Sequence, residues 1–133
     1  MSVTLPVVSG IAAAILLFTQ IVLMLNVVRA RRRLGPSPSI EPASVLEISI
    51  RRHGNLAENA GLFVAGFSIL EMLGAPKSQV VALCSAFILA RLFHAVGFGS
   101  PTMGKLRFAG TALTAVTGFA LAARLAIAAV ATW

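Results

Sequence analysis

A short polar segment near the middle of the chain combines residue types that hold a small charged ligand. Residues 51–59 read Arg-Arg-His-Gly-Asn-Leu-Ala-Glu-Asn and run directly into a long apolar segment. Arg51, Asn55 and Glu58 are spaced i, i+4 and i+7, so a helix places all three on one face. A polar face at the point where a helix enters the membrane is energetically costly unless it meets protein, water or a ligand. The rest of the chain must therefore supply a partner for this face.

Further ionisable residues lie near the ends of later apolar segments. Arg91 and His94 are spaced i, i+3 late in the third segment, and Arg107 stands near the start of the fourth. Glu58 precedes an apolar run, and a buried carboxylate must be paired or protonated. Arg91, from another helix or another subunit, is its natural partner by position. A Glu–Arg pair that only clamps helices together remains an alternative.

The composition indicates a membrane protein. The chain has 133 residues, of which 58% are hydrophobic and 11% charged, whereas soluble proteins are about a quarter charged. We expect one compact all-α domain over residues 1–133, and the single Cys84 is expected to be a small buried residue. No His, Cys or carboxylate cluster has metal-ligand spacing, so no metal is expected. Residues 1–8 lack a basic region, so the first apolar segment is expected to be a retained span.

Four apolar segments are long enough to predict a four-transmembrane-helix bundle. The predicted spans cover about residues 5–28, 44–73, 78–98 and 106–131. Ser44 and Glu47 have capping-box spacing, which predicts a helix start, and Glu71 is interpreted as a residue at the boundary of the second span. In the last span, residues 118, 122 and 126 are Gly, Ala and Ala, a ridge that permits close helix packing.

The net charge of +7 is explained by membrane orientation. The basic residues gather at the ends of apolar segments, as in the four arginines of residues 29–33, so no nucleic-acid partner is expected. The first and third connections are more basic than the second, which predicts that both termini face away from the cytoplasm. This multi-pass topology brings the ionisable residues of the spans to one membrane level, except Arg124.

The motifs resemble those of the MAPEG family, the membrane-associated proteins in eicosanoid and glutathione metabolism. The resemblance covers nearly the whole chain and rests on Arg51-x-His53-x-Asn55-x-x-Glu58, Arg91-x-x-His94 and Arg107. The chain is most similar to the small bacterial members, so a bacterial inner membrane is the expected location. The resemblance implies a homotrimer of four-helix subunits that binds glutathione between neighbouring subunits.

The resemblance also implies roles for single residues. Arg107 would be the catalytic residue that stabilises the glutathione thiolate. The glutathione-binding residues would be Arg51, His53, Asn55, Glu58, Arg91 and His94. The implied activity is that of a glutathione transferase or peroxidase acting on a lipophilic electrophile or lipid. The chain has no Tyr, and Phe98 stands where several relatives carry one, so no phenol contributes.

Two other functions are compatible with the residues. A small proton-coupled membrane transporter would use Glu58 as its proton site, although Arg51, Arg91 and Arg107 would hold that carboxylate ionised. A non-catalytic membrane protein would use the polar cluster only to lock its helices together.

Overall fold

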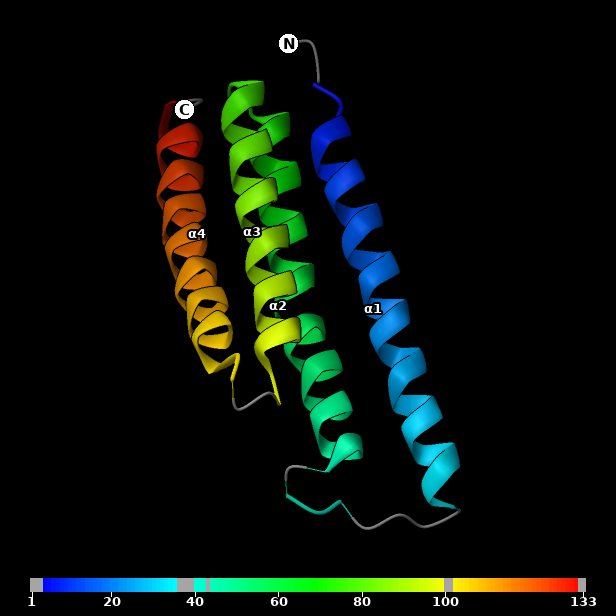
Figure 1. The fold of residues 1–133 in the computed structure, drawn as a ribbon. Coiled ribbons are helices and arrows are strands. Elements are labelled where there is room, and N and C mark those ends of the chain that lie inside the picture. The colour runs from blue at the N-terminus through cyan, green and yellow to red at the C-terminus, as the bar shows by residue number, and fades with distance from the viewer. Residues whose placement is uncertain (1–3, 36–39, 43, 100–101, 132–133) are drawn as a thin grey trace.

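The bundle consists of four long helices. The computed structural model describes residues 4–35, 40–42, 44–99 and 102–131. These ranges contain α1 (Val7–Leu34), α2 (Val45–Met72), α3 (Lys77–Gly97) and α4 (Gly104–Ala131). Successive helices run in opposite directions, and α1 and α2 extend beyond the connection between α3 and α4 (Figure 1). The predicted all-α, four-helix fold is confirmed.

Both ends of α2 are capped by local hydrogen bonds. The backbone N–H of Glu47 donates to the Ser44 hydroxyl at 3.1 Å, which confirms the predicted N-cap. At the other end Gly74 has a φ of 81°, a left-handed conformation that glycine adopts without steric cost. The N–H of Ala75 then donates to the Leu70 carbonyl at 3.3 Å. These local features fix where α2 begins and ends.

Glu71 has a role beyond that of a boundary residue, because its carboxylate caps the N-terminus of α1. One oxygen accepts from the Val8 N–H at 3.0 Å, and the other accepts from the N–H and the hydroxyl of Ser9 at 2.9 and 2.7 Å. The first amides of a helix lack intrahelical acceptors, and the helix dipole favours a negative charge beside them. Glu71 is 6% exposed, and it joins the end of α2 to the start of α1.

The outer surface of the bundle is suited to lipid. By length and composition, α1, α3 and α4 could cross a membrane, whereas α2 does not qualify because its first half carries the polar segment. Large apolar side chains face outward, with Phe18 and Phe119 70% and 79% exposed. Such a surface is unfavourable in water and favourable against acyl chains. The protein is a membrane protein, and the crossing of α2 as a fourth span stays a prediction.

An aromatic stack holds α2 against α3, and a glycine on α4 allows α4 to pack closely on α3. Phe63 on α2 stacks on Phe87 on α3 with ring centroids 4.0 Å apart. On α4, a Cβ at Gly110 would lie 2.6 Å from two backbone atoms of α3, the Ala90 carbonyl oxygen and the His94 amide nitrogen. Only glycine permits this approach, so Gly110 is one of the residues that set the distance between α3 and α4.

The small-residue ridge predicted on α4 packs closely in part, because a Cβ at Gly118 would lie 3.1 Å from the Phe63 ring of α2. Gly118 and Ala122 line clefts between α2 and α4, and Ala126 is exposed. The close approach of α4 to α3 is made at other glycines, Gly110 and Gly97.

Candidate functional site

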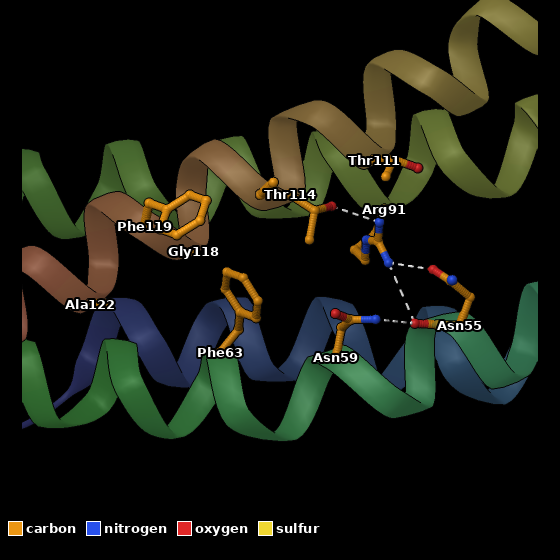
Figure 2. A pocket seen from close by; sticks show the side chains of 10 residues that line it. Asn55, Asn59, Phe63, Arg91, Thr111, Thr114, Gly118, Phe119 and Ala122 are labelled. Atoms are coloured by element: carbon orange, nitrogen blue, oxygen red, sulfur yellow. Dashed lines mark hydrogen bonds between the residues drawn. The ribbon is translucent and has the colours of Figure 1, made fainter.

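Arg91 on α3 is the buried cation around which the polar side chains of the bundle gather. It is 5% exposed. Its Nη1 donates to Oδ1 of Asn55 on α2 at 2.5 Å and, more weakly, to the Asn55 carbonyl at 3.4 Å (Figure 2). Its Nη2 donates to the Thr114 hydroxyl on α4 at 2.6 Å. Arg91 therefore links α2, α3 and α4.

All the partners of Arg91 are neutral. Among the described residues no carboxylate pairs with it, and its buried Nε has no hydrogen-bond partner. Its Cζ lies 5.8 Å from the centroid of the Phe87 ring, which adds a weak cation–π attraction. Burying an uncompensated charge costs several kcal/mol. An anion placed beside Arg91 would offset this cost.

A cleft of about 600 Å³ opens beside Arg91 between α2 and α4. Figure 2 shows that it changes in character along its length. The polar end is formed by Asn55, Asn59, Arg91, Thr111 and Thr114, and the apolar end by Phe63, Gly118, Phe119 and Ala122.

A second cleft of about 300 Å³ continues from the apolar end. It shares Phe63, Gly118 and Ala122 with the first cleft and is otherwise lined by apolar residues such as Leu62 and Leu125. The two clefts together match a ligand that has an anionic group at one end and an apolar body at the other.

The cleft is lined by one of the α2 residues that were predicted to form the site, Asn55. The others are Arg51, His53 and Glu58. Arg51 points away, with its side chain 62% exposed and its Nε 2.7 Å from a carboxylate oxygen of Glu47 on the same helix. His53 is half-buried, and its backbone carbonyl accepts a 3.4 Å bond from the Gln20 amide of α1. Within one chain, Asn55 therefore lines the cleft and bonds Arg91, whereas Arg51 is exposed and pairs with Glu47.

Glu58 does not pair with Arg91 within the described part of the chain. Its side chain is exposed, and Asn55 takes the position beside Arg91. Residues three apart differ by about 60° around a helix axis. Asn55 is directed toward Arg91 of α3, and the Glu58 side chain beside it on α2 is exposed.

His94 and Arg107 lie where α3 passes into α4. His94 is buried, and its ring centroid is 5.7 Å from that of Phe98. Arg107 is exposed, and its Cζ is 5.4 Å from the same phenyl ring. The Thr111 hydroxyl donates to the Arg107 carbonyl at 3.1 Å, so Arg107 lies one helical turn from the polar end of the cleft.

Sequence reasoning missed several polar residues of this region. Asn59 lies one turn after Asn55, and Thr111 and Thr114 are spaced i, i+3 on α4, so a search for polar stripes could have found them. Threonine is a weak signal because its hydroxyl often bonds its own helix, as Thr114 does to the Gly110 carbonyl.

Arg52 was also missed as a residue of this end of the bundle. Its Nε and Nη2 donate to the Phe98 carbonyl at 3.2 and 2.5 Å. Arg52 therefore joins α2 to the segment that follows α3, beside His94 and Arg107.

Metal-binding side chains do not gather in the described residues, where no group of three or more His, Cys, Asp or Glu could hold an ion. The polar end of the cleft offers a guanidinium, amides and hydroxyls. These groups suit an organic anion that can accept several hydrogen bonds.

Comparison with known proteins gives a family match. Residues 9–127 match the model of the MAPEG family, which is nearly the whole chain. A search of the curated proteins found no match. The matched range contains the cleft, Arg91 and Arg107.

Proposed function

Since this chain belongs to the MAPEG family, we propose that it is a membrane-bound glutathione transferase or peroxidase. In the proposed reaction, the glutathione thiolate attacks a lipophilic electrophile that reaches the site from the bilayer. The observation that carries the proposal is the position of Arg91, a buried cation with neutral partners at the polar end of a cleft that becomes apolar.

Glutathione has two carboxylates and one ammonium group at neutral pH. A carboxylate beside Arg91 would offset the buried charge and could accept a charge-assisted hydrogen bond. Asn59 and Thr111 line the same end of the cleft and offer further hydrogen-bonding groups. Arg51 and Glu58 face outward, so they would contact the peptide in a site formed between subunits of a homotrimer. His53 and His94 would complete that site from the same end of the bundle.

Arg107 is the proposed thiolate stabiliser. A free thiol has a pKa of about 8.5, so only a few per cent is ionised at pH 7. Lowering that pKa by about two units requires about 2.7 kcal/mol of preferential stabilisation of the anion. The Arg107 guanidinium, in the first turns of α4, adds its charge to the positive end of that helix.

The transfer step balances without a metal or redox partner. The thiol proton leaves to water, and the sulfur forms a bond to the electrophilic carbon. The leaving group departs with its bonding electrons. The apolar body of the electrophile would lie in the second cleft along α2 and α4, which brings it to the apolar end of the glutathione cleft.

A thermal-shift titration with glutathione in detergent tests the binding step. We expect glutathione to raise the melting temperature of the wild type and of Arg124→Gln, a matched substitution away from the cleft, but not of Arg91→Gln. Asn59→Ala, which leaves the Arg91 bonds in place, is expected to weaken binding without a loss of folding. The absence of glutathione binding by the wild type would reject the proposal.

Turnover is tested by the initial rate of conjugation of chlorodinitrobenzene. Arg107→Ala is expected to retain glutathione binding and to lose rate at neutral pH, with part of the rate recovered at higher pH where the thiol ionises unaided. An unchanged rate in Arg107→Ala would remove Arg107 from the proposed mechanism while leaving the binding proposal in place.

The hydrogen bonds of Arg91 to two other helices also favour a second candidate function, a purely structural lock. In that case Arg91→Gln lowers the melting temperature, and glutathione changes the melting temperature of neither the wild type nor the variant. The titration above therefore separates the two functions.

A further inference from the structure

We propose that the protein binds the phosphate of an anionic phospholipid in a basic cleft between the end of α1 and the start of α2. The cleft has a volume of about 300 Å³ and lies apart from the clefts between α2 and α4. Its polar lining consists of Asn26, Arg29, Arg33, Ser49 and Arg52. Three guanidinium groups, an amide and a hydroxyl thus surround one small space.

The lining residues come from two facing helix surfaces. On α1, Asn26, Arg29 and Arg33 are spaced i, i+3 and i+7, and on α2, Ser49 and Arg52 are spaced i, i+3, so each set lies on one face. Between the arginines of α1, residue 30 is a buried alanine, which lets the two helices pack closely beneath the cleft.

The positive charge of this cleft is uncompensated in the described part of the chain. None of the described lining residues is acidic. Arg29 contacts the neutral Asn26 amide at 3.5 Å, and Arg52 donates to the Phe98 carbonyl. Like charges that converge on one space repel each other, and a phosphate placed among them would relieve that repulsion and accept several charge-assisted bonds.

The position of the cleft favours a lipid phosphate. α1 is largely apolar up to Val28, and its arginines follow at once, at the level where phospholipid headgroups lie. Val22 and Leu25 stand two turns and one turn before Arg29 on the same face and are exposed, so acyl chains can pack below the phosphate. A choline headgroup would add a further positive charge to a cleft that already holds three guanidinium groups, so an anionic lipid such as phosphatidylglycerol is expected.

Native mass spectrometry of the whole protein, released from nanodiscs that contain phosphatidylglycerol and phosphatidylcholine, tests this site. We expect phosphatidylglycerol to be retained at a discrete stoichiometry in preference to phosphatidylcholine. Arg29→Gln and Arg33→Gln should each weaken this retention by about tenfold, the loss expected for one charge-assisted bond. Arg31→Gln and Arg32→Gln are the matched controls, because they remove the same charge from the same helix end without lining the cleft.

Three results would overturn the proposal. An equal effect of all four substitutions would show diffuse attraction to a charged surface in place of a site. Displacement of the lipid by millimolar inorganic phosphate or glycerol phosphate would assign the cleft to a soluble anion. Displacement by glutathione would assign it to the peptide site. The glutathione-induced thermal shift, expected to be unchanged in Arg33→Gln, confirms that the variant is folded.

Discussion

At the scale of single residues, a substitution of Thr114 tests whether the polar contacts of Arg91 stabilise the bundle. The Thr114 hydroxyl accepts a 2.6 Å bond from Arg91 and donates to the Gly110 carbonyl at 2.8 Å. Thr114→Val keeps the shape of the side chain and leaves a buried guanidinium N–H without its acceptor. We expect the free energy of unfolding to fall by about 1.5–3 kcal/mol, measured by unfolding in detergent.

Thr111→Val is the control for this prediction. Thr111 is one turn away and lines the same cleft, and among the described residues its hydroxyl bonds only its own helix, at the Arg107 carbonyl. We expect its effect on stability to stay within about 0.5 kcal/mol, the usual range for a substitution away from buried contacts. Equal losses in the two variants would contradict the special role of the Thr114–Arg91 bond.

The residues of the site were easier to predict from the sequence than the contacts that they make with one another. Arg91 and Asn55 were both expected in the site, and both line the cleft. The expected partner of Arg91 was Glu58, yet Asn55 holds that position within the chain. The choice depends on the rotation of α2 about its axis. An apolar pattern defines this rotation poorly in a helix whose lipid-facing and protein-facing sides are both hydrophobic.

At the scale of the helices, the contact between α3 and α4 depends on Gly110. In Gly110→Ala, the new Cβ would meet the backbone of Ala90 and His94 at 2.6 Å, so α4 must move outward. We expect a loss of about 1–3 kcal/mol in stability from overpacking, measured by thermal unfolding. The movement also displaces Thr114 from Arg91, so glutathione binding should weaken in the same variant.

Gly10→Ala is the matched substitution on α1. A Cβ at Gly10 meets nothing within 4 Å, and alanine is favoured over glycine inside a helix by about 1 kcal/mol. This variant is therefore expected to be as stable as the wild type or more stable. A similar destabilisation of both variants would mean that the loss comes from the exchange of glycine itself and not from the close approach of α3 and α4.

Helix ends with local signals were predictable, whereas contacts between distant residues were not. The Ser44 cap follows from a spacing of three residues, and the structure has it. The cap of α1 comes from Glu71, more than sixty residues away in the chain, and no local pattern indicates it. The helix of α1 also continues to Leu34, past the predicted end of the span at residue 28. Arginine is a good helix former, so the helix can extend through the basic residues that follow the apolar segment.

At the scale of the whole molecule, the exposed carboxylate of Glu58 leads to a prediction about the oligomeric state. Glu58 is exposed on the first half of α2, and a carboxylate facing lipid is unfavourable. We therefore expect a neighbouring subunit to cover this face, and the family resemblance implies that the assembly is a homotrimer. Light scattering in detergent should give a protein mass three times that of the 13.8 kDa chain.

The matched variants Glu58→Arg and Glu41→Arg test the position of that interface. Both make the same change of charge, but Glu41 lies outside the helices. We expect Glu58→Arg to reduce the oligomer mass and Glu41→Arg to leave it unchanged. A monomeric wild type would contradict the trimer and with it the proposed site between subunits.

The contact between Glu71 and the first turn of α1 has a consequence for biosynthesis. The nascent chain leaves the ribosome N-terminus first, so α1 enters the translocon while the carboxylate that will satisfy its leading amides is still untranslated. The amides at the start of α1 can therefore bond Glu71 only after nearly the whole of α2 has been synthesised, so the hairpin of α1 and α2 is the first unit of the chain that can complete this cap.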